Sequence, residues 1–186
     1  MGHFETAEEF IGPLSESIRP HLTEDTHLLF SYHGLPVSHV KRIDRSKAHC
    51  QTVEACCTVK CEANSLCYGR HCNETTMAVV ERLGLKPDQW SLSYQSRLGP
   101  VKWLEPSTTQ MVEALVKKGV KKLAIVAPAF LADGLETLEE LDIGIREEFM
   151  EHGGTELKVI NCLNDDEQWV RGLEQLIAKE FEQAVA

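Results

Sequence analysis

The sequence predicts an α/β protein in which helices cover both faces of a parallel sheet of about four strands, a three-layer α/β/α arrangement that carries a cysteine-rich insertion. Short apolar runs alternate along the chain with amphipathic patterns several turns long. Such alternation is typical of βαβ units, whose crossovers are right-handed. A chain of 186 residues is long enough for a buried core, so we expect residues 1–186 to form a single domain.

The first half of the chain predicts two helices and two strands. Residues 5–22 carry one apolar helical stripe, which predicts an amphipathic helix. Residues 27–32 form a short apolar run that ends at Gly34 and Pro36, so we expect a buried strand there. Asn73 can cap the next helix, which ends at Gly84, and residues 90–94 form the second strand. The side chains expected to face inward from the two helices are Phe10, Ile11, Leu14, Ile18, Leu22, Met77, Val80 and Leu83.

The second half of the chain predicts three helices and two strands. A helix over residues 107–118 ends at Gly119, and a strand over 122–126 stops before Pro128. A long helix then runs up to residues 153–154, which are both glycine. A strand over 157–160 and a helix over 165–184 complete the pattern. The apolar stripes expected to face the core from the last two helices are Leu135, Leu138, Leu141, Ile145, Phe149, Trp169, Leu173, Leu176, Ile177 and Phe181.

Composition excludes several classes of function. The net charge is -10 and the isoelectric point is about 5.3, which argues against nucleic acid or an anionic membrane surface as the main partner. The sequence has no integral membrane segment, since no apolar run approaches the length of a membrane span, and it shows no targeting segment. We therefore expect a cytoplasmic protein. Neither of the glycine-rich nucleotide-binding motifs is present.

Six of the seven cysteines lie close together within the predicted insertion, residues 45–72. The segment has few large aliphatic residues, so a cross-link must hold it, and thiolates at these spacings suit a [2Fe-2S] cluster or a tetrathiolate zinc site. The cluster is favoured because the paired C-x2-C spacing of a zinc ribbon is missing. Disulfides and inert free thiols are the other interpretations. Adjacent Cys56 and Cys57 are not expected to bind together, and Cys61 competes with them, so the ligand set stays open among Cys50, Cys56, Cys57, Cys61, Cys67 and Cys72.

A second candidate site lies where the first and third strands end. His33 follows the first strand, and the carboxyl ends of parallel strands form the edge of a sheet where ligands bind. Asp133, Glu136 and Glu140 are spaced about one helical turn apart just after the third strand, so they should reach the same edge. Crowded carboxylates can accept protons or hold a divalent cation. The alternative is a solvated helix face whose acids complement the helix dipole.

Three motifs resemble the signature blocks of ferrochelatases, in the same order and at the same spacing. The first block is Leu28-Leu-Phe-Ser-Tyr-His-Gly-Leu-Pro36. The second is Tyr94-Gln-Ser-Arg-Leu-Gly-Pro100 with Trp103-Leu-Glu-Pro106, and the third runs from Phe130 through Ala-Asp-Gly-Leu-Glu to Asp142. The resemblance covers residues 5–184 and implies an enzyme, a lyase that inserts Fe2+ into protoporphyrin IX or coproporphyrin to make heme.

The resemblance also implies roles for individual residues. His33 and Glu136 match the catalytic histidine and the acid opposite it, and Asp133 and Glu140 match members of the acidic path for metal or protons. Gln95, Ser96 and Trp103 match the loop beside the porphyrin. Two departures shorten the acidic path, because Gly134 and Gly144 stand where many family members have polar residues.

The cysteine segment resembles that of bacterial ferrochelatases with an internal [2Fe-2S] cluster, which implies Cys50, Cys57, Cys67 and Cys72 as ligands, with Cys56 or Cys61 as alternates. Ferrochelatases have two similar lobes with the porphyrin between them, and the resemblance covers the carboxyl-terminal lobe. We therefore expect the amino-terminal lobe as a partner and an isolated lobe without activity. The alternatives are a single-lobe sirohydrochlorin or cobalt chelatase, which would form a homodimer, and a non-catalytic iron-sulfur sensing module.

Overall fold

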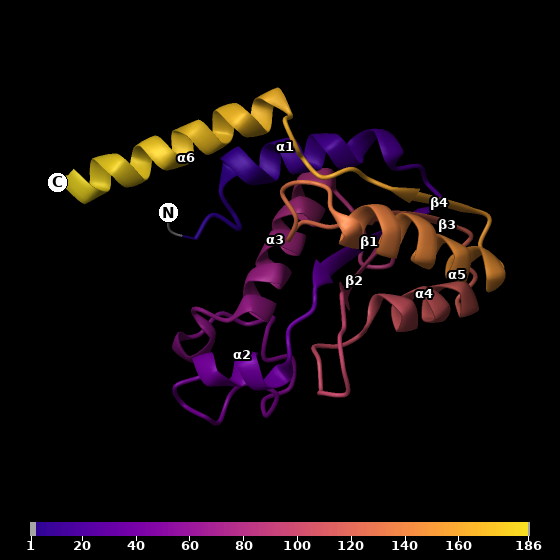
Figure 1. Ribbon diagram of the computed structural model, residues 1–186, viewed down its shortest axis with the longest axis horizontal. Coiled ribbons are helices and arrows are strands. Elements are labelled where there is room, and N and C mark those ends of the chain that lie inside the picture. The colour runs from indigo at the N-terminus through magenta and orange to yellow at the C-terminus, as the bar shows by residue number, and fades with distance from the viewer. Residues whose placement is uncertain (1–2, 186) are drawn as a thin grey trace.

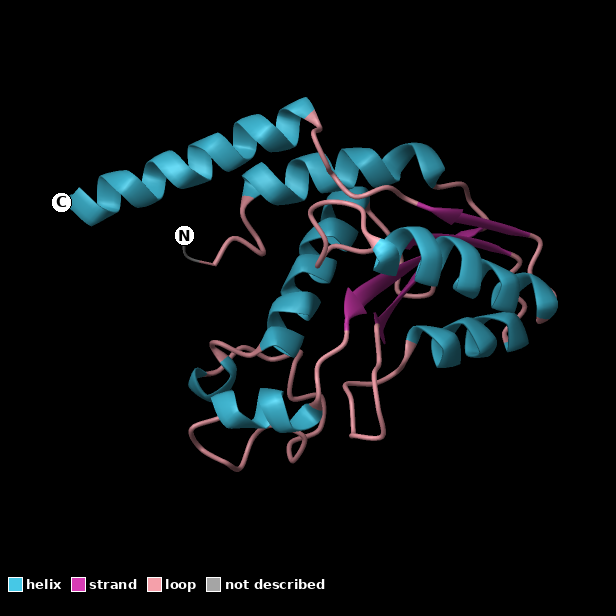
Figure 2. Cartoon of the chain, in the orientation of Figure 1, coloured by secondary structure: helices cyan, strands magenta, loops and turns pink. Residues whose placement is uncertain are grey.

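A four-stranded parallel sheet lies at the centre of the protein, as the sequence predicts (Figures 1 and 2). The computed structural model describes residues 3–185. Its strands are ordered β2-β1-β3-β4, and every neighbouring pair is parallel. The strands are β1 (Thr26–His33), β2 (Trp90–Gln95), β3 (Lys122–Val126) and β4 (Glu156–Val159). Each connection is a crossover, so the strands' carboxyl ends share one edge.

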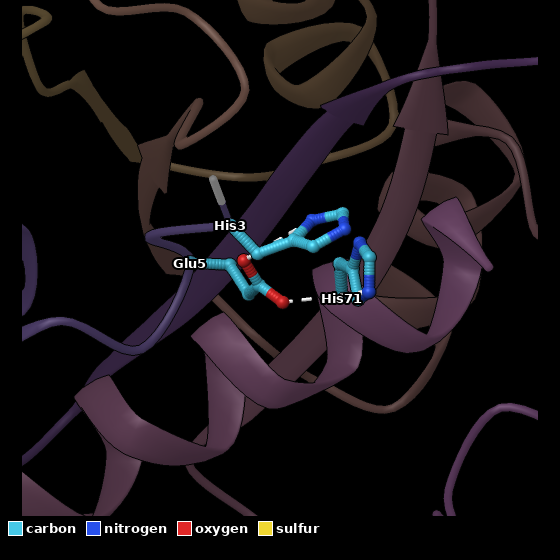
Figure 3. Close-up of side chains that lie close together, drawn as sticks. All are labelled: His3, Glu5 and His71. Carbon is cyan, nitrogen blue, oxygen red and sulfur yellow. Dashed lines mark ion pairs between the residues drawn. The ribbon is translucent and has the colours of Figure 1, made fainter. Parts of the chain in front are cut away.

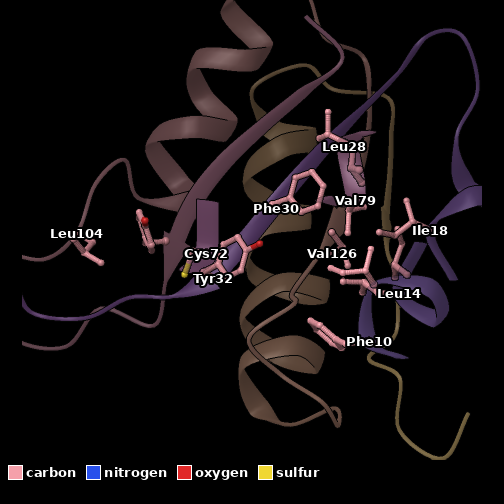
Figure 4. Packing of buried hydrophobic residues seen from close by; sticks show 14 of the residues in the cluster. Phe10, Leu14, Ile18, Leu28, Phe30, Tyr32, Cys72, Val79, Leu104 and Val126 are labelled. Carbon is pink, nitrogen blue, oxygen red and sulfur yellow. The ribbon is translucent and has the colours of Figure 1, made fainter. Parts of the chain in front are cut away.

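Alternate residues of β1 supply the two cores on either side of the sheet. Leu28, Phe30 and Tyr32 face one cluster, and Leu29 faces the other. Every one of these side chains is at most 2 % exposed. Strands buried on both faces are typical of parallel sheets, because helices cover both sides. Figure 4 shows the first cluster, in which Phe30 packs among side chains from α1, α3 and β3.

The helices divide between the two faces. On one face lie α1 (Glu8–Ile18), α3 (Tyr68–Leu83) and α6 (Glu167–Val185), and on the other lie α4 (Thr108–Lys117), η3 (Glu136–Ile145) and α5 (Arg146–Glu151). Several predicted boundaries are confirmed by their caps. The Ser107 hydroxyl accepts a hydrogen bond from the Gln110 N–H at the start of α4, and Gly84 ends α3 with φ +66°. None of the described helices combines the length and apolar character needed to cross a bilayer.

The structure differs from prediction between β1 and α3. Pro36 precedes a short helix, α2 (Val37–Ile43), that the sequence reading missed. Asn73 does not cap α3, because this helix already begins at Tyr68 with Cys67 at its cap position. The last part of the predicted insertion, residues 68–72, therefore belongs to a crossover helix. The rest of it is irregular apart from one turn, η2 (Glu62–Asn64).

Some predicted core positions are wrong. Leu135 and Leu138 are 78 % and 57 % exposed. The cause is the wider winding of η3, a π-helix, in which the Arg146 N–H bonds to the Leu141 carbonyl five residues back. Its buried stripe recurs every four residues and continues into α5, at Thr137, Leu141, Ile145 and Phe149.

Three further apolar side chains predicted to face inward are exposed. Met77 on α3 is 46 % exposed, and on α6 Ile177 is 42 % and Phe181 is 69 % exposed. Trp169 at the start of α6 is buried at 2 % and packs on Phe10. The distal half of α6 extends beyond the core, as Figure 1 shows. The apolar stripe of α6 is therefore longer than the surface of the core against which it can pack.

Candidate active site

His33 ends β1 at the carboxyl edge of the sheet. Its ring Nδ1 lies 2.6 Å from the Gly34 carbonyl oxygen. A carbonyl only accepts, so Nδ1 carries a hydrogen, and Nε2 is the ring nitrogen left for exchanging a proton. The Phe130 ring lies 5.9 Å from the imidazole, and the Tyr68 hydroxyl donates to the His33 carbonyl at 2.7 Å. The ring is thus held at the sheet edge with its Nδ1 hydrogen-bonded to the backbone.

Gln95 joins this edge to the start of η3. It ends β2 directly beside His33 in the sheet register and is only 2 % exposed. Its amide nitrogen donates to the Glu136 carbonyl at 2.9 Å, and its amide oxygen accepts from the Ser31 hydroxyl at 2.6 Å. The resemblance implies that Gln95 belongs to the loop beside the porphyrin, and in the structure its side chain is buried and holds the backbone of Glu136.

Ser96 and Glu140 come together in the structure, a contact that the sequence reading did not predict. The Ser96 N–H donates to Glu140 Oε1 at 2.7 Å, and its hydroxyl donates to Oε2 at 3.1 Å. Ser96 has φ +61°, an unusual conformation for a residue with a side chain. That conformation points both donors of Ser96 at the Glu140 carboxylate and so fixes the position of this side chain. Glu140 lies on η3, four residues after Glu136.

Asp133 does not join the other two acids. Its carboxylate accepts hydrogen bonds from Asn164 Nδ2 at 2.7 Å, the Thr137 hydroxyl at 3.0 Å and the Cys162 N–H at 3.2 Å. Partial burial raises the pKa of Asp133, but these hydrogen bonds outweigh it and leave the pKa below its ordinary value. Within the described part of the chain, Asp133, Glu136 and Glu140 do not gather within 4.8 Å of one another. The three predicted carboxylates therefore do not form one metal-binding group: Asp133 is bound by Asn164, Thr137 and Cys162, and Glu140 is bound by Ser96.

Trp103 is buried against the backbone that follows β1. A Cβ atom on Gly34 would lie 3.3 Å from its ring and 2.7 Å from the Gln95 carbonyl oxygen, so only glycine fits between them. The Trp103 indole N–H is buried and has no hydrogen-bond partner in the described residues. Exposed apolar side chains lie in the adjoining loop and on η3, namely Leu98, Val101, Leu135 and Leu138.

Most of the clustered cysteines gather at the start of α3. Cys67 occupies the cap position, where the nearby Cys57 thiol, with the N–H groups of Arg70 and Gly69, lowers its pKa to about 6 despite burial. The Cys56 and Cys57 sulfurs are 3.8 Å apart. A Cβ atom on Gly69 would lie 3.0 Å from the Cys57 sulfur. The helix start thus leaves room for closely spaced sulfurs and stabilises a thiolate.

The other cysteines differ in their surroundings. Cys50 and Cys56 line a small cavity together with Cys67, and burial, with the nearby Cys67 and Cys56, raises the pKa of Cys50 to about 11. Cys72 is 3 % exposed on α3, and burial raises its pKa. The Cys61 sulfur lies 3.7 Å from His49 Nε2, apart from the group.

The donor set at this cavity fits a cluster, which spreads its ligands over two irons, better than a single ion, because no three cysteine sulfurs of the described residues lie within 4.8 Å of one another. It offers the Cys56 and Cys57 sulfurs 3.8 Å apart, the easily ionised Cys67 and a loop already ordered around them. Asp44, which the sequence reading overlooked, orders that loop by accepting from the N–H groups of Ser46, His49 and Cys50 at 2.8–2.9 Å. Aspartate just before a serine is a turn signal that could have identified it.

Comparisons with known proteins agree with this geometry. The chain is 44% identical over 169 residues to a ferrochelatase of Pseudomonas syringae pv. syringae and 45% identical over 170 residues to one of Pseudomonas fluorescens. Each match covers 90% of this chain and 50% of the relative, so the chain spans about half the length of these curated relatives.

A solved structure shows the same fold. It is described as a cobalamin (vitamin B12) biosynthesis CbiX protein from Marinobacter aquaeolei VT8, and it matches with a TM-score of 0.50 and 17% identity. The match covers 85% of this chain and 98% of that one. The ferrochelatase family model matches residues 1–181. On the strength of that match and of the relatives above, the chain belongs to the ferrochelatase family.

Proposed function

We propose that this chain is the carboxyl-terminal lobe of a ferrochelatase that inserts Fe2+ into a porphyrin, protoporphyrin IX or coproporphyrin, to make heme. The observation that carries the proposal is that His33 ends β1 beside Gln95, whose amide holds the Glu136 backbone, while Ser96, the next residue, holds the Glu140 carboxylate at the same strand edge. The family match and the relatives named ferrochelatase support it.

Metal insertion requires bases at this edge. The free porphyrin carries two N–H groups that point into its central hole, so Fe2+ enters only as two protons leave. His33 Nε2 takes one proton, and the Glu136 carboxylate takes the other. Each such proton transfer contributes roughly 10²–10⁴-fold to the rate. Glu140, held by Ser96, passes protons or Fe2+ between Glu136 and solvent.

The amino-terminal lobe completes the cleft. Leu98, Val101, Leu135 and Leu138 are 54–83 % exposed beside the site, and exposed apolar groups of this kind mark a surface made for a partner. The unpartnered Trp103 N–H can bond to the substrate or to that lobe. Because one wall alone cannot bend a macrocycle, the lobe by itself is inactive.

A [2Fe-2S] cluster in the cysteine segment has a structural role in this proposal, with zinc as the alternative occupant. The ligands proposed are Cys50, Cys57, Cys67 and Cys72, with Cys56 or Cys61 as alternates. Cys56 gains support as an alternate because it lines the small cavity with Cys50 and Cys67. The enzyme acts in the cytoplasm.

Coexpression with the missing half tests the proposal. A strain that lacks ferrochelatase should recover heme synthesis when this chain is produced together with the amino-terminal half of a Pseudomonas relative, and not with either half alone. Growth with this chain alone would point to a homodimeric single-lobe chelatase, which an assay with sirohydrochlorin and Co2+ would identify. No growth with both halves, although they bind one another, would favour a non-catalytic iron-sulfur module.

A further inference from the structure

A second group of metal-ligating side chains lies outside the candidate active site and includes none of the cysteines, although His71 directly precedes Cys72. His3, Glu5 and His71 each offer one ligand atom, and the three atoms lie within 4.8 Å of one another. Figure 3 shows the two imidazole rings and the carboxylate turned toward each other. Two histidines and one glutamate form a ligand set that binds Zn2+ with a fourth position left open, and similar sets bind Fe2+.

The distances suit a single ion. Glu5 Oε1 lies 3.4 Å from His71 Nε2, and Glu5 Oε2 lies 3.8 Å from His3 Nδ1. Atoms that bind a tetrahedral ion at about 2.0–2.1 Å are separated from one another by roughly 3.3 Å. The two imidazole ring centres are 4.6 Å apart. Small side-chain rotations are therefore enough to bring one nitrogen of each ring and a carboxylate oxygen onto one ion.

Two of the three ligands are already held in place. His71 and Glu5 are 14% and 19% exposed, respectively. The Thr75 hydroxyl donates to the Glu5 carbonyl at 2.9 Å, and the neighbouring Phe4 ring packs 5.5 Å from that of Phe10. The fold therefore already restricts these two side chains, so less conformational entropy is lost when an ion binds.

The surroundings of His71 also suit a metal ligand. Its Nε2 lies 3.0 Å from the Ser65 carbonyl oxygen and 3.4 Å from Glu5 Oε1. An ion bound through Nε2 would replace the hydrogen bond to Ser65, whereas an ion bound through Nδ1, after a turn of the ring, would keep it. Imidazoles that bind metals commonly make such an outer hydrogen bond to a carbonyl, which fixes the ring and its tautomer. His3 is 58% exposed, so an ion can enter from its side.

We propose that His3, Glu5 and His71 bind one divalent transition ion of the Zn2+ or Fe2+ type. The ion connects the segment before α1 to the first turns of α3. This site does not depend on the proposed function, because none of its ligands belongs to the strand edge or to the cysteine set.

Metal counting in matched variants tests the proposal. The purified protein is dialysed to equilibrium against Zn2+, and in a second arm against Fe2+ without oxygen, and bound metal is counted for the wild type, His3→Ala and His71→Ala. His152→Ala is the control, since this exposed histidine lies on the far side of the chain's fold, after α5. Metal bound by cysteines contributes equally to the wild type, His3→Ala and His152→Ala. His71 adjoins Cys72, so the result for His71→Ala supports that for His3→Ala and does not replace it.

For at least one of the two metals, the wild type and His152→Ala should each bind one equivalent that His3→Ala and His71→Ala do not bind. Loss of either histidine ligand should weaken metal affinity at that site by more than about 100-fold. Loss of a residue that only hydrogen-bonds to a ligand typically weakens metal affinity by about 10–100-fold. His3 is largely exposed, so His3→Ala keeps the fold, and its circular dichroism verifies this. Equal counts and affinities for all four proteins in both arms would overturn the proposal.

Discussion

Replacing Gln95 with leucine tests whether Gln95 positions Glu136, because this change leaves the Glu136 carboxylate itself unaltered. Leucine is apolar and one bond shorter, and it cannot donate to the Glu136 carbonyl or accept from Ser31. Each buried neutral hydrogen bond contributes about 0.5–1.5 kcal/mol net, so Gln95→Leu should lower the free energy of unfolding by about 1–3 kcal/mol. For a chain of this size that corresponds to a fall in Tm of roughly 2–12 °C.

The catalytic consequence should be larger than the loss of stability suggests. Glu136 begins η3, and without the Gln95 amide its backbone can shift. A displacement of about 1 Å can reduce turnover about 10²-fold, so we expect kcat of the full-length Gln95→Leu enzyme to fall by about 10–100-fold while KM for porphyrin changes less. Thermal unfolding of the chain and a porphyrin metallation assay measure the two effects. Gln168→Leu, at an exposed position, is the control, and a Gln95→Leu enzyme with unchanged Tm and kcat would refute the reasoning.

The remaining predictions concern the glycine beside His33, the cysteine segment and Asp133. Gly34→Ala puts a Cβ 2.7 Å from the Gln95 carbonyl oxygen and should lower the free energy of unfolding by about 1–3 kcal/mol, as measured by denaturant unfolding. Gly144→Ala is the control: its Cβ would have no contact closer than 3.8 Å, so this change should be neutral or stabilising. Cys67→Ser should remove visible absorption together with bound iron and sulfide, and Cys162→Ser should keep both; a Cys67→Ser protein of unchanged colour and iron content would exclude Cys67 as a ligand. The pKa of Asp133 in the fold lies below its reference value of 3.8, so its ionised form adds stability above about pH 4, and this contribution disappears as the pH falls through the lowered pKa. The difference in unfolding free energy between wild type and Asp133→Asn, about 1 kcal/mol after solvent screening, should therefore shrink toward pH 3, and a difference that grows there would contradict this assignment.

The sheet and its order of elements were predictable because strong local signals agree with one another. Residues 27–32 are apolar on both faces of a strand, which only a covered parallel sheet accommodates. Ser107 and Gly84 are cap residues whose chemistry fixes helix ends with little help from tertiary contacts. The placement of His33 at a sheet edge followed from strand topology alone.

Other features depend on packing that a sequence pattern does not record. The period of η3 is wider than that of an α-helix, so Leu135 and Leu138 fell on the wrong face. Asp133 has the spacing of a site residue, yet it bonds to Asn164 from a distant loop. The role of Gln95 depends on a buried partner, Ser31, whose small polar side chain within an apolar strand was the available signal.

Porphyrin metallation by full-length enzyme variants tests the central claim most directly. Initial rates of Fe2+ insertion should fall by at least about 10²-fold in His33→Ala and in Glu136→Gln, with porphyrin binding and the circular dichroism spectrum retained. His152→Ala, altered away from the sheet edge, should keep the wild-type rate. Wild-type rates in both His33→Ala and Glu136→Gln would contradict the claim that the strand edge formed by β1, β2 and β3 carries the chemistry.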